Sequence, residues 1–253
     1  MYKIHFTFDT SLKAQKFKKK LFKKYLNYSP SKCDVIVVAG GDGFMLKTLK
    51  SYHKYQKSFY GINCGSYGFL MNRYNLKDLF KKINKSKQTI INPLMLTTKI
   101  KKKIKKIIAI NEISLFRQSR QTVSLNLRIG KKNIIKNLIG DGVLVSTPAG
   151  STAYNLSVNG PILTLNSKKL AVTPISPFRP RRWKGKAVSD RSKIIIKNLN
   201  PKKRPVAAVA DNYEVRNITS LVIKKNKSIK IKLLYDKNRT LFKRIKVEQL
   251  RNK

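Results

Sequence analysis

The sequence is poor in acidic residues, cysteine and histidine. Its 253 residues include 11 Asp and Glu against 57 Lys and Arg, with only two Cys and two His. So few cysteines and histidines cannot supply a disulfide framework or a plausible four-ligand zinc site. No stretch approaches the roughly 20 consecutive apolar residues of a membrane-spanning helix, and residues 1–10 lack the apolar core of a signal peptide. These absences predict a globular, cytoplasmic protein without a membrane anchor.

The positive charge is the most conspicuous feature that is present. A formal net charge of +46 would attract any polyanion, including nucleic acid. The excess comes from 44 lysines, however, against 13 arginines, and arginine is the residue that binds phosphates and bases in a bidentate way. The lysine runs at 18–24 and 101–106 contain one aromatic residue, Phe22, whereas single-strand binders need stacking platforms. The composition favours a solvated basic surface, and a nucleic-acid-binding protein remains the alternative from a different functional class.

The first ninety residues predict strands that alternate with helices. The expected strands are Lys3–Phe8, Val35–Ala39 and Phe59–Asn63, and the expected helices are Ser11–Tyr28, Phe44–Tyr55 and Leu76–Ile83. Glycine turns at 40–43 and 65–68 follow two of the strands. This pattern predicts an α/β domain over residues 1–92 with an open parallel sheet, whose ligands bind at the C-terminal ends of the strands.

The pattern changes at Asn92-Pro93, where short strands begin to follow one another. We expect them at Leu94–Ile100, Lys106–Ile110, Ile113–Arg117, Val123–Ile129, Val143–Ser146, Ala171–Pro174, Lys193–Lys197, Val206–Ala210, Ser220–Lys224 and Ile229–Leu234. They predict an all-β, sandwich-like domain over residues 93–237, with one short helix after Pro148. The tail at about 238–253 is expected to pack back on the first domain.

An acid inside a glycine turn is the first candidate for chemistry. Asp42 lies in Gly40-Gly41-Asp42-Gly43, between a buried strand and a helix whose free N–H groups would favour phosphate. The P-loop reading fails because Leu46, not glycine, precedes Lys47-Thr48. A carboxylate here would repel phosphate unless it acted as a base toward a hydroxyl or held Mg²⁺. An Asp-Gly turn without a function is the alternative.

Two further segments carry polar residues in unusual places. Residues 140–154 run from Asp141 through a Pro/Gly turn to a helix start, where hydroxyl groups and the Tyr154 ring suit a nucleotide. The alternative is a capped helix in a β-domain. The pair Asn111-Glu112 interrupts an apolar run, which a strand end or bulge would explain equally well. A serine hydrolase is not favoured, because Gly-x-Ser-x-Gly is absent here and no histidine lies near a nucleophile elbow.

Taken together, these segments resemble the NAD kinase family, in its bacterial form. The matching order covers residues 35 to about 180 and is specific because a GGDG turn is followed about a hundred residues later by GSTAY. The matching pieces are Gly40-Gly41-Asp42-Gly43, Asn63-x-Gly65-x-x-Gly68-Phe69-Leu70, Asn111-Glu112, Asp141-Gly142, Thr147–Tyr154, Gly160-Pro161 and Ser176–Pro180.

The resemblance implies transfer of a phosphoryl group from ATP to the 2′-hydroxyl of the adenosine ribose of NAD, which makes NADP. Asp42 would be the catalytic base, with Gly43 beside the phosphates. Asn111 and Glu112 would hold the ribose and adenine, and Asp141 would bind toward the nicotinamide half. The remaining residues implied at the dinucleotide site are Phe69, Ala149, Thr152, Ala153, Tyr154, Asn155, Leu156 and Ser157.

The resemblance also implies the cofactor and the partners. A divalent metal, Mg²⁺, would arrive with ATP, and no metal-ligating residue of the chain is assigned. NAD and ATP would be the substrates, and the protein would be a homo-oligomer, a dimer or tetramer, without a specific nucleic acid or membrane partner. Independently of the resemblance, Tyr213, beside Asp211 and Glu214, is a candidate for contact with a partner subunit, and a solvated acid cluster is the alternative. A GGDG-type lipid or sugar kinase, polyphosphate as donor and NADH as acceptor stay open.

Overall fold

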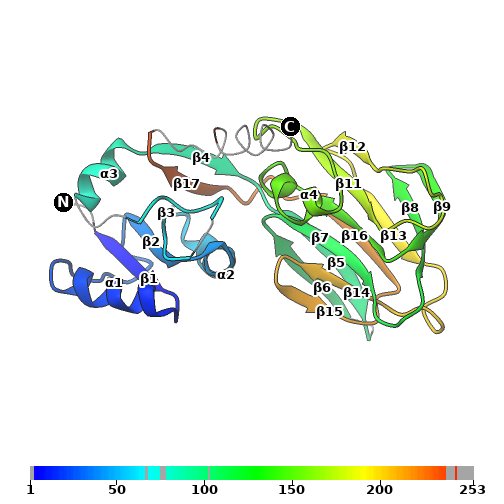
Figure 1. The fold of residues 1–253 in the computed structure, drawn as a ribbon, viewed down its shortest axis with the longest axis horizontal. Helices are drawn as coiled ribbons and strands as arrows, with labels where there is room; N and C mark the ends of the chain where they lie inside the picture. Colours follow the sequence, from blue (N-terminus) through cyan, green and yellow to red (C-terminus); the bar gives the residue numbers. More distant parts are fainter. Residues whose placement is uncertain (1–2, 66–67, 75–77, 102, 238–242, 244–253) are drawn as a thin grey trace. The chain divides into compact units, whose positions relative to one another are not determined.

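A computed structural model of the protein describes residues 3–65, 68–74, 78–101, 103–237 and 243. The chain divides into two units (Figure 1). The first contains the described residues up to 91 together with those from 228 onward, and the second contains 92–227. The chain enters the second unit beside the predicted boundary at Asn92-Pro93, and it returns to the first unit before it ends.

The first unit is built on a five-stranded sheet in the order β1-β2-β3-β17-β4. Its strands are β1 (Ile4–Phe8), β2 (Val35–Gly40), β3 (Ser58–Asn63), β4 (Lys87–Ile91) and β17 (Ile231–Tyr235). β2 is buried along its whole length, as a β-branched run covered on both faces should be. β1, β2, β3 and β17 run parallel, while β4 runs antiparallel to β17. The expected parallel sheet is therefore correct for β1, β2 and β3. β17 joins it as a further parallel strand, and the unpredicted edge strand β4 makes it mixed.

Two sequence expectations about the domain limits were wrong. The strand expected at Ile229–Leu234 was assigned to the second domain, but β17 pairs with β3 and β4 in the first unit. Residues 228–237 therefore belong to the first unit rather than to a domain ending at 237. Apolar alternation identifies a strand but cannot identify its partner, because pairing is decided by contacts far apart in sequence. The tail expected at 238–253 lies outside the described residues, apart from Lys243.

The predicted helices are present but shorter than expected. They are α1 (Leu12–Phe22), α2 (Asp42–Tyr52) with the 3₁₀ turn η1 (His53–Tyr55), and α3 (Leu79–Lys85). α1 ends before the expected Tyr28 because the next segment lies along the edge of β1. There the N–H of Phe6 donates to Asn27 Oδ1, and the N–H of Tyr28 donates to the carbonyl of Ile4. The start expected for the third helix, at Leu76, lies outside the described residues.

The second unit is a sandwich of two six-stranded antiparallel sheets, as predicted (Figure 1). One sheet has the order β12-β11-β10-β7-β14-β15, with bounds Lys186–Ser189, Lys169–Ile175, Gly142–Ser146, Glu112–Arg117, Val206–Ala210 and Tyr213–Val215. The other has the order β6-β5-β16-β13-β8-β9, with bounds Lys103–Ala109, Leu94–Ile100, Ser220–Lys225, Ile194–Asn198, Val123–Ile129 and Lys132–Gly140. Side chains from both sheets form one buried cluster, to which Leu96 and Val145 both belong.

The helical part expected after Pro148 is a pair of single turns. These are the 3₁₀ turn η2 (Ala149–Thr152) and the helix α4 (Tyr154–Ser157). The strands β9, β12 and β15 were not predicted, because their sequences are short or interrupted by lysine and asparagine. They are held instead by pairing with β8, β11 and β14.

Candidate functional site

Asp42 is the first residue of α2, directly after the strand β2 and Gly41. Its carboxylate accepts two backbone hydrogen bonds, from the N–H of Phe69 at 2.6 Å to Oδ2 and from the N–H of Leu70 at 3.0 Å to Oδ1. Hydrogen bonds to an ionised group are among the stronger ones, and a helix N-terminus favours a negative charge. The position and the orientation of this carboxylate are therefore fixed from two sides.

The loop that follows β3 is shaped to deliver these two N–H groups. At its start, the N–H of Gly65 donates to Asn63 Oδ1 at 2.9 Å. A Cβ atom on Gly68 would lie 3.0 Å from Asp42 Oδ1, so glycine at this position makes room for the carboxylate. The motif Asn63-x-Gly65-x-x-Gly68-Phe69-Leu70 thus acts through its backbone as a clamp on Asp42.

Asn72 anchors the far end of this loop. The residue is fully buried, and its Nδ2 donates to the carbonyl of Leu234 at 3.0 Å. Its Oδ1 accepts the N–H of Asp236 at 3.0 Å, while Asp236 also accepts the hydroxyl of Tyr60 at 2.6 Å. The strand β17, which returns late in the chain, therefore helps to hold the loop that orients Asp42.

The glycines around Asp42 differ in what the fold requires of them. A Cβ on Gly40 would lie 2.8 Å from the Phe44 ring, so packing demands glycine there. For Gly41 and Gly43, no described atom lies within 4 Å of a Cβ, and neither has a positive φ. The described fold does not need glycine at these two positions. They leave bare backbone at the N-terminus of an 11-residue helix, where a phosphate can approach closely.

In the second unit, the turn after β10 packs directly on the segment before β7. The N–H of Thr147 donates to the carbonyl of Asn111 at 2.9 Å, and the Thr147 hydroxyl donates to the carbonyl of Ile110 at 2.9 Å. A Cβ on Gly150 would lie 2.3 Å from the Asn111 carbonyl oxygen. Only glycine permits this approach, so the Pro/Gly turn and the Asn111-Glu112 pair form one structural unit.

Glu112 has an unusual environment for a carboxyl group. Its side chain is half-buried, but the Oε2 atom is inaccessible and has no hydrogen-bond partner in the described part of the chain. Burial raises the pKa of Glu112 to about 8, and the negative charge of Asp211 adds to the rise. Most molecules therefore carry a neutral carboxylic acid here at pH 7, which can donate a hydrogen bond.

Tyr154 is near enough to Asp141 and Glu112 to be affected by their charges. Its ring centroid is 5.7 Å from that of Phe116. Burial raises the pKa of the Tyr154 hydroxyl, and the charges of Asp141 and Glu112 raise it further. The hydroxyl consequently remains protonated over the physiological range, and the three polar groups form one cluster beside an aromatic ring.

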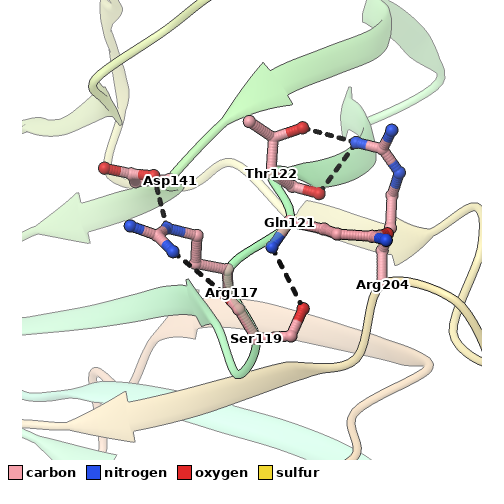
Figure 2. A network of polar contacts seen from close by, with 6 residues as sticks. All are labelled: Arg117, Ser119, Gln121, Thr122, Asp141 and Arg204. Carbon is pink, nitrogen blue, oxygen red and sulfur yellow. Dashed lines mark hydrogen bonds and ion pairs between the residues drawn. The ribbon is translucent and has the colours of Figure 1, made fainter.

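Asp141 is held by an ion pair on the surface (Figure 2). Arg117 Nε donates to Asp141 Oδ1 at 2.5 Å, and its Nη1 donates to the carbonyl of Ser119 at 3.0 Å. Both charged side chains are more than a third exposed, so the pair contributes little to stability. It does fix the direction in which the Asp141 carboxylate points.

Asn155 is a buried junction rather than an open polar group. Its Nδ2 donates to the carbonyls of Ser151 and Pro161, both at 3.0 Å. Its Oδ1 accepts the hydroxyl of Thr173 at 2.7 Å, and a Cβ on Gly160 would lie 2.1 Å from this oxygen. Both donors of the amide are thus committed inside the protein, and the side chain fixes the course of the chain after η2.

Two family models match the chain over most of its length. The ATP-NAD kinase N-terminal domain matches residues 1–89, and the ATP-NAD kinase C-terminal domain matches residues 110–218. The chain belongs to the ATP-NAD kinase family. The two matched segments correspond to the two units of the structure, apart from the return of the chain through β17.

Relatives in this ATP-NAD kinase family are similar over nearly the whole chain. The NAD kinase of Zymomonas mobilis is 45% identical over 94% of this chain and 94% of its own length. The NAD kinase of Caulobacter vibrioides is 43% identical, with 93% and 91% covered. That of Rickettsia bellii is 41% identical, with 98% of each chain covered.

Solved structures of ATP-NAD kinases share the fold. A crystal structure of an Archaeoglobus fulgidus NAD kinase in complex with ATP matches with a TM-score of 0.75 at 22% identity, covering 97% of each chain. A yeast NADH kinase in complex with NADH matches with a TM-score of 0.77 at 24% identity, covering 89% of this chain and 69% of the yeast chain.

The residues expected at an ATP-NAD kinase site fall into a set in each unit. Asp42, Gly43 and Phe69 lie together in the first, where Phe69 contributes its backbone N–H to Asp42. In the second, Asn111 directly precedes β7, Glu112 is its first residue and Asp141 lies between β9 and β10. The others lie on the turns after β10, from η2 to α4: Ala149, Thr152, Ala153, Tyr154, Leu156 and Ser157. Asn155 lies on α4 as well, and its amide donors are used inside the protein.

Asp211 is a residue of this site that sequence reasoning missed. In the sequence it was noted only as a neighbour of Tyr213, the residue expected to meet a partner subunit. Its carboxylate accepts the backbone N–H groups of Ile110, Asn111 and Glu112. The sequence did offer one indication of a role: Asp211 is followed by asparagine in a turn, and the chain has only eleven acids. Its contact with a segment a hundred residues earlier was not readable from the sequence.

Two features are absent from the described residues. No helix among them is long and apolar enough to cross a membrane. Within the same residues, no group of three or more His, Cys, Asp or Glu is arranged to hold a metal ion.

Proposed function

We propose that this member of the ATP-NAD kinase family transfers the terminal phosphoryl group of ATP to the 2′-hydroxyl of the adenosine ribose of NAD, forming NADP and ADP. The observation that carries the proposal is the clamped carboxylate of Asp42 beside the bare backbone of Gly43. An acid in a phosphate-binding turn has a chemical purpose when a hydroxyl must lose a proton there. The family relationship supplies the identity of that hydroxyl.

Asp42 acts in this proposal as the general base. Its carboxylate accepts the proton of the ribose hydroxyl while the hydroxyl oxygen attacks the terminal phosphorus and the bond to ADP breaks. Such a base contributes about 10²–10⁴-fold to the rate. Most of the remaining catalysis in phosphoryl transfer comes from positioning and electrostatic stabilisation. The two N–H donors from Phe69 and Leu70 support this role because they hold the carboxylate in one orientation.

The phosphates of ATP would lie against the N-terminus of α2. The N-terminus of a helix attracts negative charge, and Gly41 and Gly43 carry no side chain that would cover its backbone. We propose that Mg²⁺ would be carried by the triphosphate and would supply neutralisation of the charge on the transferred group. A metal carried in this way needs only one or two protein carboxylates, and Asp42 is the carboxylate present at this turn.

The dinucleotide would be held by the second unit. We propose that Asn111 and Glu112 contact the adenosine ribose and adenine, and that Asp141 lies toward the nicotinamide half. The neutral carboxyl of Glu112 and the protonated hydroxyl of Tyr154 offer donors that do not repel the pyrophosphate. The proposal retains Phe69, Ala149, Thr152, Ala153, Leu156 and Ser157 as lining residues and gives Asn155 a positioning role.

A coupled assay tests the function directly. Purified protein is mixed with NAD, ATP and Mg²⁺, and NADP is measured after enzymatic reduction to NADPH. NADP formation supports the proposal, and its failure with every donor and metal tried, including polyphosphate, would overturn it. Parallel reactions with NADH, sugars and lipids as acceptors distinguish the lipid or sugar kinase. Tight, salt-sensitive nucleic-acid binding without ATP consumption would favour the basic binding protein instead.

We also propose a cytoplasmic location and, on the family resemblance alone, a homo-oligomer of two or four copies. Sedimentation velocity measures the number of copies, and a single monomeric species at micromolar concentration would contradict the oligomer.

A further inference from the structure

Asp211 joins two segments of the second unit that are a hundred residues apart. It lies in the turn between β14 and β15 with a φ of +54°. Its Oδ2 accepts the N–H of Ile110 at 2.8 Å, and its Oδ1 accepts those of Asn111 at 2.8 Å and Glu112 at 3.4 Å. In return, the N–H of Asp211 donates to the carbonyl of Glu112 at 3.1 Å.

These bonds continue the sheet beyond the end of its ladder. β14 pairs with β7 as far as Ala210 opposite Ile113, and residues 110–111 lie outside the strand assignments. Three successive N–H groups that converge on one carboxylate form an anion-binding concavity, and bonds to an ionised acceptor are stronger than neutral ones. The Asp211 side chain therefore supplies the partner that a neighbouring strand would otherwise provide.

The segment held in this way carries the two residues proposed to contact NAD. From the other side, the same segment is fixed by Thr147 and by the close approach of Gly150 to Asn111. The backbone of residues 110–112 is thus clamped between a turn and an acid. This clamp leaves little freedom to the directions in which the side chains of Asn111 and Glu112 leave the chain.

Glu112 is also affected by the charge of the clamp. Asp211, on the turn after β14, is the acid whose charge raises the pKa of Glu112, after burial. Tyr154 on α4 is affected in turn by Glu112 and by Asp141, which precedes β10. On β10, Ser146 is opposite Glu112 in register, and its hydroxyl donates to the Thr147 carbonyl. Asp211 is therefore placed to influence both where Glu112 points and whether it carries a proton.

We propose that Asp211 is a positioning residue for NAD binding, which holds residues 110–112 through their backbone and thereby aims Asn111 and Glu112 at the dinucleotide. The inference rests on the proposed function, because it takes NAD as the ligand of this segment. A purely structural lock on the hairpin would affect stability alone. Positioning, in contrast, affects NAD affinity and its dependence on pH.

The variant Asp211→Asn tests the clamp with little change of shape. Asn tolerates a positive φ, and its Oδ1 can still accept two N–H groups. Its Nδ2 would face the N–H of Ile110, donor against donor, and the negative charge is lost. The matched control is Glu214→Gln, which removes an acid from the adjoining strand, where Glu214 pairs with Arg216 rather than with residues 110–112.

Amide hydrogen exchange followed by mass spectrometry gives the first readout. The amides of residues 110–112 should be protected in the wild-type protein and exchange about tenfold faster or more in Asp211→Asn, while Glu214→Gln leaves them unchanged. Wild-type amides that exchange as fast as those of an exposed turn would overturn the clamp, even if the variant did not fold. This readout needs no NADP formation, so it stands apart from a failure of the proposed function.

Kinetics give the second readout. For Asp211→Asn we expect the KM for NAD to rise about tenfold or more and the KM for ATP to change by less than about twofold. NAD affinity should fall as pH rises, because Glu112 then loses its proton and becomes negatively charged. Without the charge of Asp211 the pKa of Glu112 is lower, so in the variant this fall should occur at lower pH. A variant that folds, keeps the wild-type KM for NAD and keeps the wild-type pH profile would overturn the positioning role.

Discussion

The backbone N–H of Phe69 lies 2.6 Å from Oδ2 of Asp42, and donates a hydrogen bond to it. This bond links the first residue of α2 to the loop after β3. The glycine turn that contains Asp42 and the loop that contains Phe69 therefore form one site, although the two residues are 27 positions apart in sequence. A side chain at position 68 would crowd the same carboxylate. The geometry explains why the acid and the glycine-containing loop occur together, and it is the basis of the first prediction.

Asp42→Asn should abolish most phosphoryl transfer while NAD still binds. The amide keeps the size of the carboxylate but cannot accept the ribose proton, so kcat should fall by about 10²–10⁴-fold with a nearly unchanged dissociation constant for NAD. NADP formation and calorimetric titration with NAD measure the two quantities. Asp34→Asn, an exposed acid of the same unit that bonds Lys3, serves as control. Near-normal turnover in Asp42→Asn would show that the base is assigned wrongly.

Gly43→Ala should separate the needs of the fold from those of the ligand. No described atom lies within 4 Å of a Cβ at this position, and alanine is the better helix former by up to about 1 kcal/mol. Stability should therefore stay equal or rise. The KM for ATP should rise about tenfold, because the methyl group covers backbone that a phosphate would approach. An unchanged KM for ATP would show that Gly43 does not contact the phosphates.

Gly150→Ala is the matched opposite case. Its Cβ would lie 2.3 Å from the Asn111 carbonyl oxygen, so the backbone of two segments must move apart. Overpacking of this kind costs about 1–3 kcal/mol, and urea unfolding should show it. The contact also holds the NAD segment, so the KM for NAD should rise in parallel. Wild-type stability in this variant would contradict the described packing.

Glu112→Gln should change how stability depends on pH. The pKa of Glu112 is about 8 in the folded protein, against 4.5 for an unperturbed glutamate. Between these values the folded state keeps a proton that the unfolded state releases, so wild-type stability falls as pH rises from about 4.5 to about 8. Glutamine mimics the protonated acid and does not titrate. The free energy of unfolding of Glu112→Gln, relative to that of the wild type, should therefore increase as pH rises across this range.

The expected difference for Glu112→Gln is at least about 1 kcal/mol between pH 5 and pH 8.5, smaller than the full linkage because the side chain is partly exposed. Thermal or urea unfolding at a series of pH values measures it. Glu214→Gln makes the same exchange at an exposed position and serves as the control for titrations elsewhere in the protein. Parallel pH profiles for the wild type and Glu112→Gln would mean that Glu112 ionises normally.

Asn155→Ala should destabilise the second unit. The carbonyls of Ser151 and Pro161 and the hydroxyl of Thr173 would lose their partner inside the protein, which costs about 2–5 kcal/mol in total. NAD affinity measured at low temperature, where the variant is still folded, should change much less than stability. A large loss of NAD affinity without a loss of stability would show that Asn155 contacts NAD directly.

Part of the fold could be predicted because its signals are local. β2 and β14 were recognisable from unbroken apolar runs. β5 and β8 were recognisable as short stretches rich in apolar residues between turn and polar residues. β4, β9 and β15 were not predicted, because they contain lysine, asparagine or glutamate and are stabilised by their neighbours in the sheet. β17 was found but assigned to the wrong unit, because its partners lie about 140 to 175 residues away in sequence.

The site shows the same division. Asp42, Glu112 and Asp141 attracted notice in the sequence because acids are scarce and these three occur in turns or apolar runs. Asp211 is also one of the few acids, but its role depends on the backbone N–H groups that it contacts in the folded protein. Asn155 was predicted as a ligand contact, and only the structure shows that three protein groups already use its amide.

The sequence by itself determined the chemical groups, their order and the order of the two units. It could do so because glycine turns, periodic apolar residues and isolated acids reflect local backbone conformation and local exposure to solvent, which do not depend on distant contacts. Only the tertiary structure decided how those groups are held: Asp42 by two N–H groups, Glu112 in a site that keeps its proton, and residues 110–112 by Asp211. The physical reason is that orientation and protonation depend on atoms that folding brings close and that the order of residues leaves far apart.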